Sequence, residues 1–239
     1  MKNRFLLILY FFISISLNSI ANENKFEVSN IELENSGKII IANNGKYTSK
    51  DGKFEVVANK FIYNKEESLL LIFEGEAKNK FDDLKIKFDK SIYNENDLTL
   101  SSEGDVIIED KIKNLLIRSD SIIFDRKNNL LLIKGNVKVH ETAKDYTFES
   151  EKIIIDRKYD IIKSETKSII QDRFKNILSV NKFELNKGII KIKDLNFKDL
   201  EDNSLNLDSA QIDIISNELI GKDIMINLSN LTFAEENEP

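Results

Sequence analysis

The sequence contains no cysteine and no tryptophan, and its single proline is the last of 239 residues. Without cysteine no disulfide can support the fold. The only histidine, His140, has no cysteine partner, and one histidine cannot complete a His-based metal site alone. Because His140 follows Val139 in an alternating segment, we interpret it as an exposed residue at the end of a strand. These shortages exclude cysteine nucleophiles and metal sites built from cysteine or from several histidines.

Carboxylates are plentiful but scattered along the chain. Asp125-Arg126, Asp156-Arg157 and Asp172-Arg173 recur, and paired acids could in principle hydrolyse a sugar linkage. The first two pairs fall in polar turns, where aspartate is favoured because it bonds the local backbone. No phosphate-binding loop, nucleophile elbow or metal signature is present in the sequence. We therefore predict no catalytic residue, no metal and no cofactor, and a protein that is not an enzyme.

The formal net charge is −6, and it becomes −8 when Lys2 and Arg4 are removed with the N-terminal segment. A net acidic chain is a poor nucleic-acid binder, so we expect no nucleic-acid partner. Charges of both signs are interspersed, as on a solvated strand face.

The first 21 residues are typical of a cleaved secretory signal peptide. A basic start precedes an uncharged apolar run, Phe5 to Leu17, and small residues at 19 and 21 predict cleavage after Ala21. The alternative is an uncleaved anchor, but the run is short against the roughly 20 residues that cross a bilayer. No cysteine follows it, which excludes a lipid-modified N-terminus. We expect export of the mature protein out of the cytoplasm.

A sequence pattern of about 30 residues repeats along most of the chain. Equivalent starts lie 29 to 31 residues apart, at Val28, Ala58, Phe88, Ser119, Ser150, Val180 and Ser209. A period of this size indicates a stack of similar supersecondary units, whose function belongs to the surface that the stack creates.

Each copy predicts two short strands joined by a polar turn. In the fourth copy Ile122 and Phe124 alternate with polar residues, and a second apolar segment with Leu132 follows the turn. Gly75, Gly104 and Gly135 are predicted to supply a bulge or bend, although copies five to seven lose or move this glycine. After the first 21 residues no stretch has helical periodicity. We predict an all-β domain over residues 22–230 and an acidic tail or linker at 231–239.

The alternation places one apolar face along the whole stack. That face either fills a closed core or, if the two walls splay, forms a continuous groove able to hold acyl chains. The candidate lipid-binding residues are Ile31, Phe61, Leu71, Phe124, Leu132, Ile153, Ile155, Phe183 and Ile212.

The repeat pattern, behind an expected signal peptide and without cysteine, resembles the OstA-like family. The resemblance covers about Val28 to Leu228, and it is strongest at Ala58–Ala77 and Ser119–Val139. The family includes the lipopolysaccharide-transport bridge protein LptA and the N-terminal periplasmic domain of LptD. It implies an open β-jellyroll of about seven hairpin repeats whose interior shields the acyl chains of lipopolysaccharide. It also implies a location in the periplasm in association with the outer membrane, stacking with other Lpt-type modules through edge strands, and assembly with an outer-membrane barrel.

Two types of family member fit the sequence. The chain resembles either a stand-alone LptA-type bridge or a truncated LptD-type domain. The second resemblance is slightly better, because the composition of residues 231–239 is typical of a linker. Two other classes stay open: a parallel β-solenoid that acts as a surface adhesin or processes polysaccharide, and a purely structural periplasmic interaction module. Antiparallel pairing of hairpins would indicate the jellyroll, whereas parallel stacking of coils would indicate the solenoid. Binding of acyl chains would distinguish a lipid carrier from the structural module.

Overall fold

The computed structural model describes residues 24–80, 83–143, 145–171, 173–199, 203–213, 216 and 218–228. The predicted signal peptide and the predicted tail at 231–239 lie outside the described residues. Within the described ranges the only helical element is one 3-10 turn, Asn35–Gly37. The all-β prediction is confirmed.

The strands follow one another with short turns between them. The first nine are β1 (Lys25–Glu34), β2 (Ile39–Thr48), β3 (Phe54–Asn64), β4 (Leu69–Asn79), β5 (Leu84–Asn94), β6 (Thr99–Asp110), β7 (Leu115–Asp125), β8 (Leu130–Glu141) and β9 (Tyr146–Asp156). They are followed by β10 (Ile161–Ser164), β11 (Ser168–Gln171), β12 (Ile177–Asn186), β13 (Ile189–Lys198), β14 (Ser204–Asp213), β15 (Glu218–Lys222) and β16 (Met225–Asn227).

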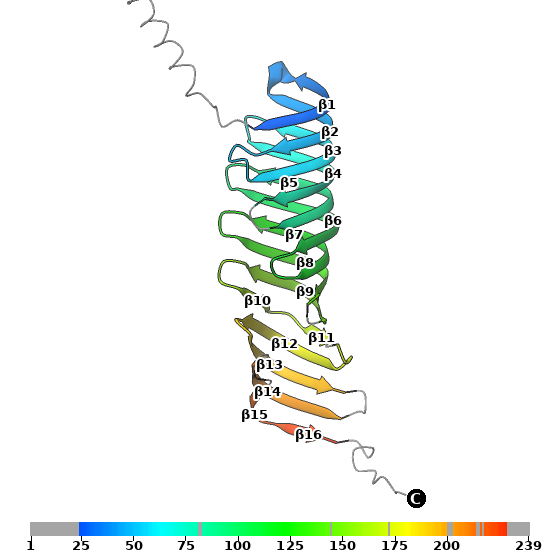
Figure 1. Cartoon of the computed structure of the whole chain (residues 1–239), viewed down its shortest axis with the longest axis vertical. Helices are drawn as coiled ribbons and strands as arrows, with labels where there is room; N and C mark the ends of the chain where they lie inside the picture. Colours follow the sequence, from blue (N-terminus) through cyan, green and yellow to red (C-terminus); the bar gives the residue numbers. More distant parts are fainter. Residues whose placement is uncertain are drawn as a thin grey trace, which may run out of the picture.

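These strands form one 16-stranded sheet in nearly sequential order. Neighbours along the path from β1 to β15 pair antiparallel, as consecutive hairpins do. Figure 1 shows the result as a long stack whose strands lie across its length, with β1 at one end and β16 at the other. The fold is an open β-jellyroll built from hairpins, and the antiparallel pairing is not the coil stacking of the solenoid alternative.

The long strands bend near their middle, so that each contributes to two walls around one interior. Leu178 and Leu185, from the two halves of β12, face the same cavity. Between β7 and β8 the register shifts at the bend, between Arg118 and Ser121. Alternate long strands have one residue at this bend with a left-handed backbone conformation (positive φ). Most of these residues are asparagine or aspartate, which tolerate that conformation: Asn44, Glu74, Asp105, Asn136 and Asp194. Each predicted pair of short strands is therefore part of two longer, bent ones.

Two of the three predicted glycines have the predicted role. Gly104 and Gly135 have φ values of +79° and +74°, and a Cβ on Gly135 would lie 2.3 Å from Oδ2 of Asp120. Gly75 is constrained by close packing instead, because a Cβ there would lie 2.9 Å from the Cβ of Ala58.

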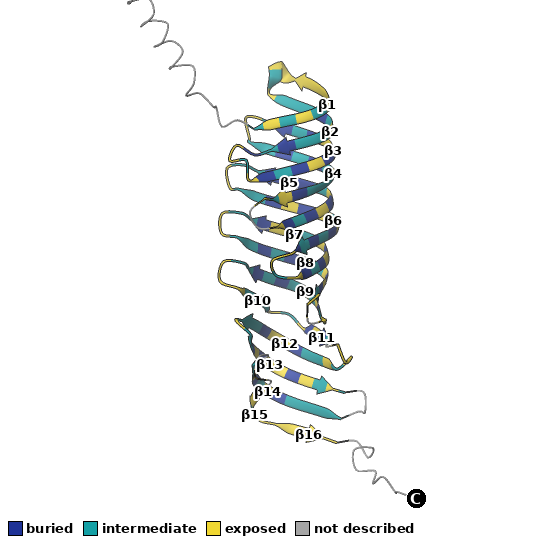
Figure 2. Ribbon diagram, viewed as in Figure 1, coloured by how far each residue is buried: buried dark blue, intermediate teal, exposed yellow. Residues whose placement is uncertain are grey.

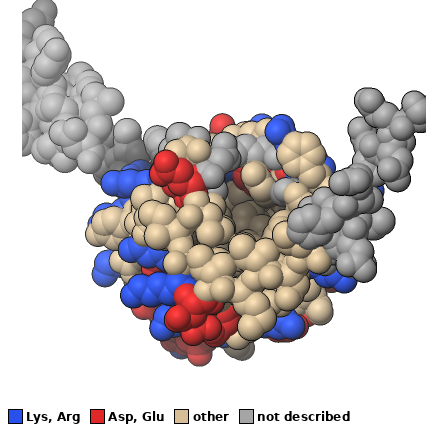
Figure 3. All heavy atoms as spheres, turned by 90° about the horizontal axis from the view of Figure 1, so that it is seen from below, with Lys and Arg blue, Asp and Glu red and all other residues tan. Residues whose placement is uncertain are grey.

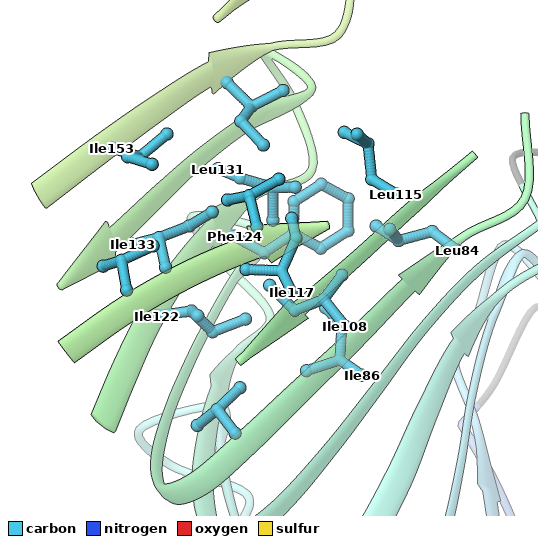
Figure 4. Packing of buried hydrophobic residues seen from close by; sticks show 14 of the residues in the cluster. Leu84, Ile86, Ile108, Leu115, Ile117, Ile122, Phe124, Leu131, Ile133 and Ile153 are labelled. Carbon is cyan, nitrogen blue, oxygen red and sulfur yellow. The ribbon is translucent and has the colours of Figure 1, made fainter. Parts of the chain in front are cut away.

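Two rows of inward side chains face each other along the first nine strands. One row contains Tyr63, Leu70, Tyr93, Leu100, Phe124, Leu131 and Ile155. The other contains Tyr47, Val56, Ala77, Ile86, Ile108, Ile117, Val139 and Phe148. All are buried, and Figure 4 shows the residues of β5 to β9 filling the interior from both walls. Burial of this apolar surface is the main stabilising contribution to the stack.

The regular pattern changes after β9. The short strands β10 and β11 together take the place of one long strand, and both pair with β9 on one side and β12 on the other. The bend is replaced by residues 165–167. Here the hydroxyl of Ser150 lies 3.0 Å from that of Ser164 and accepts a hydrogen bond from Ser168 at 3.0 Å. We call β1 to β9 the N-terminal section and β10 to β16 the C-terminal section.

Candidate functional site

The two inward rows continue into the C-terminal section, but there they surround a cavity. One row continues through Ile162, Leu185, Ile190, Ile212 and Leu219, and the other through Ile170, Leu178, Phe197 and Leu205. Together with side chains at the end of the N-terminal section they line a cavity of about 480 Å³. This volume lies within the range typical of pockets for small ligands.

The pocket is apolar inside and polar at its edge. Four lining residues at or near the turns have charged or amide side chains: Lys113, Glu141, Asp160 and Asn176. The hydroxyl-bearing Tyr146, at the start of β9, also lines the pocket. Figure 3, viewed from the β16 end, shows a hollow ringed mainly by uncharged atoms, with the charged groups on the outside. Figure 2 shows fewer fully buried positions in β13 to β16 than in the strands above them.

In the N-terminal section the free edges of the two walls are held together. We call the turns that follow β3, β5, β7 and β9 rim one, and the turns that follow β2, β4, β6 and β8 rim two. Along rim one, the Arg157 N–H donates to the Asn129 carbonyl at 3.1 Å, and along rim two, the Thr142 N–H donates to the Asn114 carbonyl at 2.8 Å. Equivalent bonds join the earlier turns. Each rim is thus a continuous edge rather than a set of independent loops.

Two arginines of rim one reach across the interior to aspartates in rim two or at the strand end beside it. Arg157 Nε donates to Asp110 Oδ2 at 2.9 Å, and these side chains are only 4% and 1% exposed. Asp110 also accepts the Lys113 N–H through its other oxygen, at 3.1 Å. The arginine is further fixed by donating to Asn129 Oδ1 at 3.0 Å. This pair fastens the two rims at the boundary with the pocket.

Arg126, one repeat earlier, makes the second cross-link. Its guanidinium lies 3.2 Å from Asp51 Oδ2, donates to the Tyr93 hydroxyl at 2.6 Å and lies 4.7 Å from the centre of the Phe54 ring. Burial opposes ionisation of Asp51. The hydrogen bonds from Ser49 and the Lys53 N–H, together with the Arg126 charge, nevertheless hold its pKa below the usual value.

Glu95 occupies the equivalent position in the preceding repeat, but its carboxylate contacts tyrosine hydroxyls instead of an ion-pair partner. It accepts hydrogen bonds from the hydroxyls of Tyr47 at 2.5 Å and Tyr63 at 2.9 Å. Burial, with the hydrogen bond to the Glu95 carboxylate, raises the pKa of Tyr63 to about 12. The same causes raise the pKa of Tyr47 further. Together, Glu95, Arg126 and Arg157 close the interior of the N-terminal section.

The nine predicted lipid-binding residues occupy four different environments. Phe61, Phe124, Ile153, Ile155 and Phe183 point inward but are at most 3% exposed, so they belong to the packed interior. Ile212 alone of the nine lines the pocket. Ile31 pairs with buried Ala42 and so belongs to an inward row, yet it is 54% exposed because β1 is the end strand.

The inward assignment of Leu71 and Leu132 is wrong. Each lies between two buried neighbours in its strand and therefore points to the opposite, outer face. Leu71 pairs there with Ile62 and Ile92, which belong to the same partly exposed outer row. In these two repeats the second apolar segment contains three consecutive leucines, 69–71 and 130–132, and the prediction chose the third leucine instead of the second.

Most pocket residues escaped the sequence analysis for a related reason. The predicted residues lie in the halves of the strands that adjoin the turns of rim one, whereas Phe148, Leu178 and Phe197 lie beyond the bend. The bulge shifts the alternation there, which hides the continuity of the inward row. The alternation of Tyr146 and Phe148 with polar neighbours was the available signal.

The turn interpretation of the aspartates is correct where it can be followed. Asp125 Oδ1 accepts the Asn128 N–H at 2.9 Å, and Asp156 Oδ1 accepts the Lys158 N–H at 3.0 Å. Asp172 lies outside the described residues. His140 sits near the end of β8, with its ring 3.4 Å from the Thr147 hydroxyl. Within the described ranges no three or more His, Cys, Asp or Glu side chains gather as they would around a metal ion.

A second hollow of about 470 Å³ in the C-terminal section is lined by residues of β10 and of β12 to β15, Phe183 among them. Its rim carries five lysines and two glutamates: Lys163, Lys182, Lys191, Lys193, Lys222, Glu165 and Glu184. Lys182 and Lys193 are directly opposite each other in the register, and Lys182 pairs with Glu165. The interspersed charges of the sequence therefore produce a locally basic surface here.

Comparison with models of known families and with curated proteins gave no match to this chain. In the part of the chain that the structure describes, no helix combines the length and the hydropathy required to span a bilayer.

Proposed function

We propose that the protein holds acyl chains of an amphiphilic lipid in the pocket of the C-terminal section. The apolar cavity of about 480 Å³ between the two inward rows carries this proposal. Each methylene that moves from water into such a site contributes about 0.8 kcal/mol, so a chain of ordinary length binds without any specific polar contact. The polar head group of the lipid stays at the mouth, where the turns and strand ends supply polar side chains.

The lipid that we propose is lipopolysaccharide, carried across the periplasm toward the outer membrane. The support is the resemblance of the repeat pattern to the OstA-like family, together with the hairpin jellyroll and its inner cavity. The function is transport rather than catalysis, and the chain would take part in assembly at the outer membrane either as an LptA-type bridge or as an LptD-type domain.

Exposed strand edges support the proposed stacking with other β-jellyroll modules. β1 lies at one end of the sheet order. At the other end, β15, β16 and the residues that flank β16 expose large apolar side chains: Ile220, Ile224, Met225, Ile226 and Leu228. An unpaired edge with apolar side chains can add a strand from a second chain. The same observation favours the second candidate function, a structural interaction module that binds neighbours but no lipid.

Photo-crosslinking in lipopolysaccharide-producing cells separates the two functions. A photoreactive residue at Ile212 faces the pocket, whereas one at the adjacent Gln211 faces outward. We expect a lipopolysaccharide adduct at 212 and none at 211. Exported, folded protein without an adduct at 212 would contradict lipid binding and favour the structural module.

A further inference from the structure

The mouth of the pocket contains one cation. Among the described residues that line it, Lys113 is the only lysine or arginine. Its Nζ lies 2.5 Å from Oδ1 of Asp160, across the gap between rim two and rim one. The other charged lining residues, Glu141 and Asp160, are carboxylates, so Lys113 is the one group of the described lining that can bind an anionic head group.

The lysine is held in position while its partner is more exposed. The Lys113 N–H is bound by buried Asp110, which is itself fastened to Arg157. The Lys113 side chain is 29% exposed, whereas that of Asp160 is 55% exposed. An ion pair with this exposure stabilises the fold by at most about 1 kcal/mol, so exchanging Asp160 for another anion costs little.

We infer that Lys113 is a head-group subsite: an amphiphile whose chain occupies the pocket places a phosphate or carboxylate on Lys113 and displaces Asp160. This inference rests on the proposed acyl-chain pocket and adds the class of ligand, an anionic single- or multi-chain amphiphile. A phosphate gains more than a carboxylate because it offers more acceptor oxygens and a higher charge for a hydrogen bond to an ammonium group. Asp160 disfavours ligands that bring no anion to replace it at Lys113.

Three amphiphiles with the same chain test the inference by calorimetry below their micelle concentrations. Dodecyl phosphate, dodecyl maltoside and dodecyltrimethylammonium share the tail and differ in head-group charge. We expect the phosphate to bind about tenfold more tightly than the maltoside, as for one charge-assisted hydrogen bond. The ammonium compound should bind no better than the maltoside.

Two variants assign that preference to the ion pair. Lys113→Met keeps the approximate length of the side chain but removes its charge. In this variant dodecyl phosphate should bind about as tightly as dodecyl maltoside. Asp160→Asn keeps a residue type that tolerates the φ of 60° and frees Lys113, so it should increase the preference. The matched control is Lys187→Met, because Lys187 is an exposed turn lysine that does not line the pocket. It should leave the preference unchanged.

The outcomes separate the inference from the proposed function. If no amphiphile binds the wild-type protein, the acyl-chain pocket itself is wrong. If all three bind equally, or if Lys113→Met keeps the phosphate preference, only the head-group subsite is wrong. Inorganic phosphate alone should not bind in the same concentration range. If it competes with dodecyl phosphate, Lys113 belongs to a site for free anions, and the inference fails.

Discussion

Phe124 in the N-terminal section and Ile212 in the C-terminal section occupy the same inward row of the sheet. Phe124 is 1% exposed and surrounded by packed side chains, whereas Ile212 faces an open cavity. Both sections have the same alternation of apolar and polar residues. The difference is that ion pairs from Arg126 and Arg157 hold the rims of the N-terminal section together, and the strand beyond β9 is split in two. The separation of the walls therefore decides whether the same inward face forms a core or a groove.

The cross-links and the packed core of the N-terminal section limit how far a lipid chain can move inside the molecule. Continuous passage along the interior would require the cross-links at Asp110 and Asp51 to open, because the side chains behind them fill the space. Replacing a buried ion pair by apolar residues is often neutral or stabilising. A contribution to stability alone therefore does not explain why charged side chains cross-link the rims of the N-terminal section.

The largest expected effect comes from breaking one cross-link. Asp110→Ala leaves the Arg157 charge buried without its carboxylate, and we expect a loss of about 3–5 kcal/mol in the free energy of unfolding. Urea denaturation measures this loss. The control, Asp160→Asn, affects an exposed pair and should change stability by less than about 1 kcal/mol. Equal effects of the two variants would show that the buried cross-link does not fasten the rims.

The second prediction compares two isoleucines of the inward face. Ile153→Ala leaves a void in the packed section, and we expect it to cost about 2–5 kcal/mol. Ile212→Ala enlarges an existing cavity and should cost clearly less, but it should weaken the binding of a dodecyl amphiphile. The two unfolding curves, each with and without dodecyl maltoside, provide the measurement. A larger loss of stability at 212 than at 153 would mean that the pocket is filled in solution.

A third prediction concerns the bends. Gly135→Ala forces a side chain into a left-handed backbone and toward Asp120, and we expect a loss of about 1–3 kcal/mol in stability. Gly221→Ala, in the C-terminal section, meets only the flexible end of Leu207 at 2.8 Å, and its backbone is not left-handed. Thermal denaturation should therefore distinguish the two variants, and similar melting temperatures would contradict the assigned role of the bend.

The smallest expected effect is a dependence of stability on alkaline pH. The folded protein has a raised pKa for Tyr63, about 12, against about 10 when unfolded. The contribution of Tyr63 is therefore fully present below pH 10 and is lost as the pH rises through 12. Tyr63→Phe should flatten this part of the stability profile. An unchanged slope in that variant would assign the effect to other groups.

The fold was predictable from the sequence to a large extent, and the pocket only in small part. The alternation and the repeat predict antiparallel hairpins, and the glycines at 104 and 135 mark bends, because these signals are local. Leu71 and Leu132 were placed on the wrong face because a run of three apolar residues does not define the phase of the alternation. The roles of Arg126 and Arg157 depend on partners 75 and 47 residues away. No local pattern contains that information, so whether the groove is open was not predictable.

The most direct test of a filled N-terminal section and an open C-terminal section is a crystal structure of the protein with 12-bromododecanoate. The anomalous signal of bromine locates the end of the chain without assumptions about the ligand. We expect it inside the C-terminal section, among residues such as Leu178, Leu185 and Phe197. A bromine site between β2 and β8, or a ligand bound only on the outer face, would contradict the central claim.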